Sequence, residues 1–74
     1  MKITVKLFAT LRTGRFDETV LDIEGTAVIE YLLELLNLKH EEVAIIMING
    51  RHCGRNTVIS EGDVVALFPP IGGG

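Results

Sequence analysis

The start of this chain alternates between apolar and polar residues. Ile3, Val5 and Leu7 are separated by polar residues, and this period of two predicts a strand with one buried face over residues 2–8. Residues 18–23 resume the alternation less regularly, with Leu21 and Ile23 on one side. Only the short segment 9–16 connects the two strands, so we expect them to form an antiparallel hairpin.

The period changes to that of a helix after residue 25. Thr26 is predicted to be the N-cap, because its hydroxyl can accept a hydrogen bond from the first free N–H groups of a helix. The helix is expected to end near Asn37, a residue that tolerates the left-handed cap conformation. Its predicted core face is apolar and its opposite face acidic. The apolar face consists of Val28, Leu32, Leu35 and Leu36 and is widened by Ile29 and Leu33. The acidic face consists of Glu30 and Glu34.

The continuous apolar run 43–48 predicts a central strand that is buried on both faces. Asn49 and Gly50 follow it, and this dipeptide favours a two-residue hairpin turn in which both residues have positive φ. Residues 51–53 are then the short return strand.

The last part of the domain contains two further apolar segments. Val58 and Ile59 are expected to enter the core, and residues 64–68 are predicted to form the last strand after a turn at Gly62. Alternation places Leu67, like residue 65, inward and Phe68 outward. The sequence therefore predicts an α+β fold in which one main helix packs on one face of a mixed sheet. Residues 1–68 form the domain, and residues 69–74 form an extended tail.

The tail combines conformationally restricted residues with residues that have no side chain. Pro69 and Pro70 fix φ and favour extended geometry, whereas Gly72, Gly73 and Gly74 have no side chain. Folding requires no such segment, but a narrow channel in a partner accepts only residues of this kind. We interpret the tail as an arm that carries the α-carboxylate of Gly74 into a partner's active site. The alternative is a frayed terminus.

The size and the net charge of the chain argue against several classes of function. The chain has 74 residues, a net charge of −3 and one cysteine, Cys53. So short a chain offers little room for an enzyme pocket, and its acidity argues against nucleic acid and anionic membranes as partners. No apolar run is long enough to cross a bilayer, and the first residues lack a signal-peptide core. We therefore expect a cytoplasmic, non-catalytic protein.

Few side chains are candidates for chemistry. Cys53 is interpreted as a small packed hydrophobe and not as a reactive thiol. His40 and His52 lack the accompanying ligands of a metal site, and we predict none.

Three segments carry a family resemblance. They are residues 7–12 (LFATLR), residues 48–51 (INGR) and residues 61–74 (EGDVVALFPPIGGG). With the order of elements, they resemble the ubiquitin-like β-grasp sulfur carriers, and most of all the small subunit of molybdopterin synthase. Thiamine-pathway carriers share the Gly-Asp turn and terminal glycines but usually lack the Phe-Ala…Arg segment and the two prolines. The chain departs from the family pattern at Thr13, where an acidic residue is common, and at Gly72.

The resemblance implies a mechanism. A ubiquitin-activating-type enzyme adenylates the Gly74 carboxylate with ATP and Mg²⁺, and a sulfur donor converts it to a thiocarboxylate. The carrier, which itself binds no cofactor, then docks on the large catalytic subunit and donates sulfur to a pterin precursor of the molybdenum or tungsten cofactor.

The resemblance also assigns roles to residues. Pro69, Pro70, Ile71, Gly72 and Gly73 would insert into the partner, and Arg12 would lie on the partner-binding surface. Phe68 and Phe8 are expected at the same interface because alternation places these aromatics outward. A solubilising loop cation is an equally good interpretation of Arg12. Three other functions remain open, namely a modifier joined to target lysines, a sulfur carrier for thiamine synthesis, and an interaction domain with an inert tail.

Overall fold

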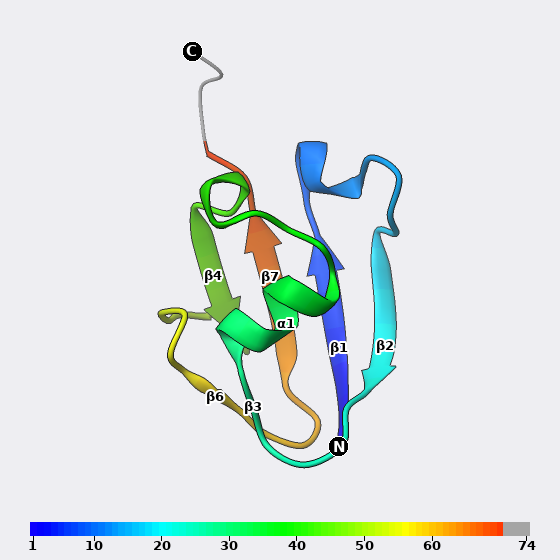
Figure 1. Cartoon of the computed structure of the whole chain (residues 1–74), viewed down its shortest axis with the longest axis vertical. Coiled ribbons are helices and arrows are strands. Elements are labelled where there is room, and N and C mark those ends of the chain that lie inside the picture. The colour runs from blue at the N-terminus through cyan, green and yellow to red at the C-terminus, as the bar shows by residue number, and fades with distance from the viewer. Residues whose placement is uncertain (71–74) are drawn as a thin grey trace.

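The computed structural model of the chain describes residues 1–70. Its elements are, in order, β1 (Lys2–Leu7), η1 (Ala9–Arg12), β2 (Glu18–Asp22), β3 (Ala27–Val28), α1 (Ile29–Leu35), η2 (His40–Glu42), β4 (Ile45–Ile48), β5 (Arg51–His52), β6 (Val58–Ile59) and β7 (Val64–Phe68). Figure 1 shows α1 lying across the sheet, with η1 at the end of the molecule toward which β7 runs. No helix among the described residues is long and apolar enough to cross a membrane.

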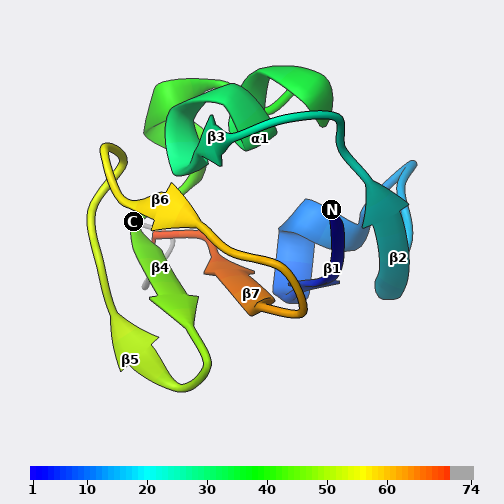
Figure 2. The same ribbon diagram turned by 90° about the horizontal axis from the view of Figure 1, so that it is seen from below.

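The main sheet is mixed, as the sequence predicted. Its strand order is β2-β1-β7-β4-β5, and a separate two-stranded sheet joins β3 to β6. The first hairpin is antiparallel, whereas β1 and β7 run parallel with Val5 beside Val65 and Leu7 beside Leu67. Figure 2 shows α1 over one face of the sheet. This one-helix arrangement confirms the predicted fold class.

The core lies between α1 and the sheet. It follows the predicted alternation, because every second residue of β1 and β7 is buried and the residues between them are exposed or half-buried. Burying a large aliphatic side chain stabilises a fold by about 1.5–3 kcal/mol, so these strands provide much of the stability of a small domain. The core side chains of these elements and of α1 are Ile3, Val5, Leu7, Ile29, Leu32, Leu33, Val65 and Leu67.

The predicted start of the helix was wrong. Thr26 is not the N-cap, because Ala27 and Val28 pair with β6 and the helix begins only at Ile29. No side chain caps this end. Instead the N–H groups of Ile29 and Glu30 donate to the carbonyls of Thr57 (3.0 Å) and Arg55 (2.9 Å). The predicted end was right, since Asn37 has φ of 56° and the N–H of the next residue reaches back to the Leu33 carbonyl.

Three expectations about burial also need correction. Leu35 is 50% exposed, because the short helix turns Leu32 and Leu33 to the core instead. Val58 is 57% exposed, and only its neighbour Ile59 enters the core. β4 is neither central nor buried on both faces, since β7 occupies the centre of the sheet and only Ile46 of β4 is fully buried.

The Asn49-Gly50 turn is confirmed, with φ of 52° and 81°. Asn49 also has a role that the turn motif did not indicate. Its side-chain amide donates to Asp63 Oδ1, and its Oδ1 accepts from the N–H of Val64, both at 2.9 Å. These bonds fasten the β4–β5 turn to the start of β7.

Candidate functional site: the root of the tail

The tail begins where hydrogen bonding of β7 stops. The carbonyl of Phe68 accepts from the N–H of Ala44 at 2.9 Å, and the carbonyl of Leu67 accepts from the N–H of Phe8 at 3.2 Å. Pro69 and Pro70 have no N–H, so they cannot continue either ladder. The tail therefore starts from a backbone that is held on both sides. Ile71, Gly72, Gly73 and Gly74, which carry the predicted insertion and reaction, lie outside the described residues.

Phe8 and Phe68 form a stacked pair at this root. Their ring centroids are 4.3 Å apart and their planes differ by 11°. The parallel register explains the contact, because Leu7 lies beside Leu67 and each phenylalanine is the next residue on its strand path. Both rings lie on the face opposite α1 and are half-buried. The outward position predicted for Phe68 is therefore correct, but neither aromatic is isolated.

A tight turn of the chain places Arg12 beside the Phe8 ring. Ala9, the first residue of η1, has φ of 53°, which is unusual for a residue with a side chain. Arg12 Nε then donates to the Leu7 carbonyl at 2.9 Å, and its Cζ lies 5.6 Å from the centre of the Phe8 ring. Asp17 Oδ1 is 3.8 Å from Nε, and the Arg12 side chain remains 47% exposed. The guanidinium is thus oriented while most of its donors remain available.

We call Phe8, Arg12, Phe68, Pro69 and Pro70 the tail-root surface. The structure brings together the three interface residues expected from the sequence and places them beside the first two tail residues. This combination of aromatics and one arginine is typical of binding hot spots.

The sequence did not reveal that the open sheet face extends this surface. Ile45 pairs with Phe68, and Met47 pairs with Ala66. Cross-strand partners share a face, so both β4 residues lie on the side away from α1, where they are only partly buried. No described residue forms a layer over this face. These partly buried apolar residues make the open face a candidate interaction surface.

The other candidates for chemistry do not gather into a site. Cys53 is partly buried and packs against the core, and its N–H donates to the Ile46 carbonyl at 3.0 Å. Within residues 1–70, no three histidine, cysteine or acidic residues are grouped so that they could hold a metal ion.

Comparison with known proteins identifies the family. The sequence matches the ThiS family over residues 5–74, which is almost the whole chain. The chain belongs to the ThiS family. No curated protein matches it significantly.

Solved structures agree with this ThiS-family assignment. A putative molybdopterin converting factor subunit 1 from Pyrococcus furiosus is 30% identical with a TM-score of 0.76, and the alignment covers 96% of this chain and 99% of that one. SAMP1 from Haloferax volcanii is 26% identical with a TM-score of 0.77 and full coverage of both chains. At 24% identity, the subunit 1–subunit 2 complex of the molybdopterin-converting factor from Helicobacter pylori shares the fold, with a TM-score of 0.68 and full coverage of both chains. This ThiS-family protein is a ubiquitin-like β-grasp sulfur carrier, a small carrier subunit by family.

Proposed function

We propose that this chain carries sulfur as a thiocarboxylate on Gly74 and delivers it to a pterin precursor on the large subunit of a molybdopterin synthase. The observation that carries the proposal is the tail-root surface, where Phe8, Arg12 and Phe68 meet at the start of the Pro-Pro tail. These residues belong to the two segments that resemble the molybdopterin branch more than the thiamine branch. The 30% identity to a putative molybdopterin converting factor subunit 1 supports the same branch.

The chemistry takes place at the carbonyl carbon of Gly74. A carboxylate oxygen of Gly74 attacks the α-phosphate of ATP, pyrophosphate leaves, and an acyl-adenylate forms on the activating enzyme. Hydrosulfide then attacks the carbonyl carbon, and AMP and a proton leave, which gives the thiocarboxylate. Activation is needed because a free carboxylate has no good leaving group. On the large subunit the thiocarboxylate sulfur bonds to a pterin side-chain carbon as an oxygen substituent leaves that carbon, and water then hydrolyses the bond between sulfur and the acyl carbon. Each carrier thus supplies one of the two sulfurs of the dithiolene.

The carrier contributes positioning to this sequence. β7 holds the tail root through two backbone hydrogen bonds, and the prolines limit the conformations of the segment that follows. A preorganised arm loses less entropy when it enters a channel, so more of the docking energy is available to place Gly74. The apolar open face, with Phe68 and Ile45 at its end nearest the tail, is the surface on which the large subunit docks. The complex of subunits 1 and 2 from Helicobacter pylori is a precedent for such a partner.

Sulfur transfer in a purified system tests this proposal. The chain bearing a thiocarboxylate at Gly74 is mixed with a molybdopterin synthase large subunit and the pterin precursor. We expect dithiolene to form while Gly74 returns to the carboxylate. A parallel reaction with the thiazole-forming enzyme of the thiamine pathway is the control. Transfer to the thiazole alone would contradict the pterin assignment and leave the carrier chemistry in place.

A second candidate function is conjugation to lysine side chains, favoured by the full-length similarity to SAMP1, an archaeal modifier protein. Arg55 is the last basic residue, so trypsin would leave the long fragment 56–74 on any modified lysine. Gly72→Arg shortens that remnant to Gly-Gly. Conjugation would be established by lysine peptides that carry the Gly-Gly remnant in cells expressing G72R. These peptides should be absent when Gly74 is removed.

A further inference from the structure

One hydrogen bond at the tail root comes from a peptide group that is also held on its other side. The N–H of Ala44 donates to the Phe68 carbonyl at 2.9 Å, and this carbonyl belongs to the peptide bond with Pro69. The Val43 carbonyl lies in the same planar peptide unit as the Ala44 N–H and points the opposite way. It accepts from Arg55 Nη2 at 2.6 Å. We call this connection from the guanidinium through one peptide plane to the Phe68 carbonyl the arginine bridge.

Arg55 orients and strengthens this bond to Phe68. Its Nη2 also donates to the His40 carbonyl at 2.9 Å, so one nitrogen holds both the first residue of η2 and the residue that follows η2. Hydrogen bonds from a charged donor are stronger than those between neutral groups. A cation at a carbonyl also polarises the peptide group, and the N–H of that group becomes a better donor.

The loop that carries Arg55 is fixed to the start of α1. The Arg55 carbonyl accepts from the N–H of Glu30 at 2.9 Å, and the Thr57 carbonyl accepts from the N–H of Ile29 at 3.0 Å. Glu30 Oε2 lies 4.0 Å from Arg55 Nε and provides a counter-charge, and the Arg55 side chain is only 25% exposed. The helix therefore holds both the backbone and the side chain from which the arginine bridge starts.

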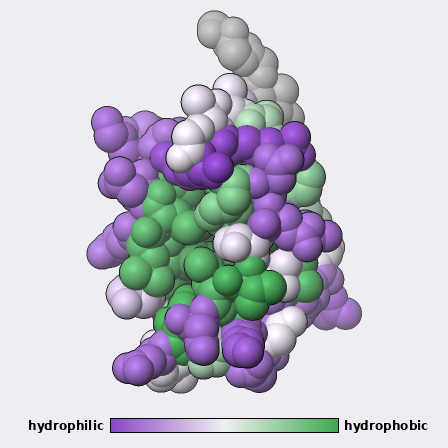
Figure 3. Space-filling view, turned by 90° about the vertical axis from the view of Figure 1, so that its right-hand side faces the viewer, coloured by the Kyte–Doolittle hydropathy of each residue, from purple (hydrophilic) through white to green (hydrophobic). Residues whose placement is uncertain are grey.

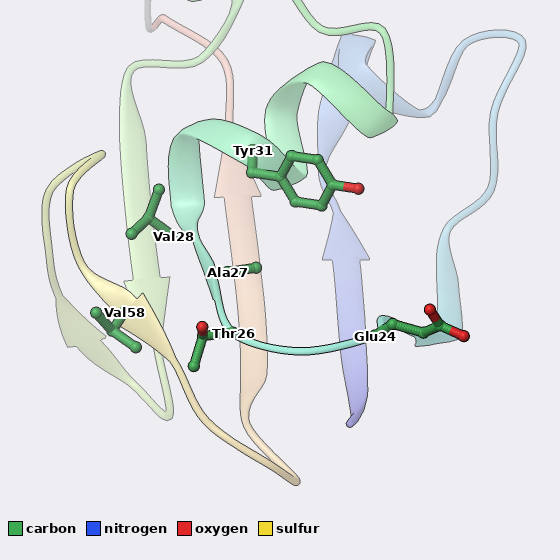
Figure 4. A pocket seen from close by; sticks show the side chains of 6 residues that line it. All are labelled: Glu24, Thr26, Ala27, Val28, Tyr31 and Val58. Atoms are coloured by element: carbon green, nitrogen blue, oxygen red, sulfur yellow. The ribbon is translucent and has the colours of Figure 1, made fainter.

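The exposed apolar side chains near this loop are not members of the arginine bridge. Tyr31 follows Glu30 on α1, is 46% exposed, and lines an open pocket together with Val28 and Val58 (Figure 4). On the side of β2, Figure 3 shows a band of polar side chains between the larger apolar surface and the end of the molecule where β7 ends. A substitution at Tyr31 therefore alters the surface beside Glu30 and leaves the arginine bridge in place.

We propose that Arg55 is a positioning residue for sulfur delivery, an inference that rests on the proposed function of the tail. Through the arginine bridge it sets the direction in which Pro69 leaves the sheet, and with it the path along which the tail enters a partner. Arg55 does not belong to the tail-root surface, so its loss should leave docking intact. It should lower the rate of transfer, because small displacements of a reacting group slow a reaction strongly.

Amide hydrogen exchange in the full chain tests the arginine bridge itself. The bond from the Phe8 N–H to the Leu67 carbonyl also holds the tail root but is not part of the bridge, so it is an internal control. In Arg55→Met, exchange of the Ala44 amide should accelerate about tenfold more than exchange of the Phe8 amide, because a charge-assisted hydrogen bond is lost. Equal acceleration of the two amides would indicate only a general loss of stability and would overturn the proposal.

Sulfur transfer by the thiocarboxylated chain tests the consequence for function. With the large subunit and the pterin precursor, Arg55→Met should lower kcat about tenfold and leave the KM for the carrier unchanged. Arg55→Lys keeps the charge but not the planar donor group, so its kcat should lie between those of Arg55→Met and the wild type. The Lys variant also keeps the test decisive if Arg55→Met does not fold.

Two further variants are matched controls for this experiment. Arg51→Met removes the same charge from an exposed position on β5, and Tyr31→Ala alters the helix beside Glu30. Both should transfer sulfur at the wild-type rate. An unchanged kcat in Arg55→Met, a raised KM alone, or an equal loss in Arg51→Met would overturn the proposal. Absence of transfer from the wild-type chain would contradict the proposed function instead, and the exchange of the Ala44 amide would still decide the role of Arg55.

Discussion

The two faces of β7 have different physical explanations. On the side of α1, Val65 and Leu67 are fully buried in the core. On the open side, Ala66 and Phe68 are only half-buried, although they are equally apolar in type. Folding accounts for the first pair, because the helix covers it. Nothing among the described residues covers the second pair in the same way, which is consistent with the proposed docking of the large subunit on this side.

The two faces of the sheet also differ in the charge of their side chains. The helix-side face of β1 has Ile3, Val5 and Leu7 in the core, whereas its open side carries Lys2 and Lys6. The open face thus becomes apolar only toward β7 and β4, where Phe68, Ile45 and Met47 lie. The β1–β2 border of this patch is mixed in charge, because Glu18 and Asp22 are the cross-strand partners of Lys6 and Lys2.

The largest effect on stability is expected at the buried face. Leu67→Ala should lower the free energy of unfolding by about 3 kcal/mol, because it leaves a cavity between α1 and the sheet. Urea denaturation followed by circular dichroism measures the loss. A much smaller loss would mean that the two faces are less distinct than the burial of Leu67 indicates.

Phe68→Ala should have its main effect on binding. We expect affinity for the large subunit to fall by about 2 kcal/mol, as at an aromatic hot spot. Loss of the stack with Phe8 should cost the free domain only about 0.5–1.5 kcal/mol. Calorimetry of the complex and urea denaturation of the free chain measure the two quantities. Phe68→Leu is the matched control, and unchanged affinity in Phe68→Ala would remove this residue from the interface.

Arg12→Ala should weaken the same complex by about 1 kcal/mol and should cost the free domain no more than about 1 kcal/mol, through loss of the hydrogen bond to the Leu7 carbonyl. Its ion pair with Asp17 is exposed, and such pairs contribute little to folding. Arg12→Lys keeps the charge but cannot reproduce the planar donor group over Phe8, so its affinity should fall between those of the wild type and Arg12→Ala. Identical binding by all three chains would support the alternative that Arg12 is a solubilising loop cation.

The smallest expected effect on the fold is that of the tail end. Removing Gly73 and Gly74 should leave the Tm of the domain unchanged, because β7 and its hydrogen bonds end at Phe68. The same truncation should abolish sulfur transfer. A clear fall in Tm on differential scanning calorimetry would show that the tail packs on its own domain.

Local patterns allowed the sequence to predict many of these features. Alternation placed Leu67 inward and Phe68 outward, and the Asn-Gly dipeptide identified the turn at Asn49, because strand period and turn conformation depend on adjacent residues. The mixed sheet with one helix followed from the order of these segments.

Long-range contacts explain the errors. Thr26 has the chemistry of an N-cap, but pairing of Ala27–Val28 with a strand some thirty residues away moved the helix start. The apolar run around Ile46 predicted burial on both faces, because a continuous run does not distinguish a covered face from a binding face. The stack of Phe8 on Phe68 required the parallel register of β1 and β7, which residues far apart in the sequence create together.

The most direct test of the sulfur-carrier account is the intact mass of the chain after co-expression with its activating enzyme and a sulfur source. The account predicts that one oxygen is replaced by sulfur, that the change lies in the C-terminal fragment with Gly74, and that Cys53→Ser does not prevent it. Adding one residue after Gly74 should abolish the change and leave the fold intact, because the reactive carbon then belongs to an amide. Sulfur found on Cys53 as a persulfide, with Gly74 unmodified, would contradict the account.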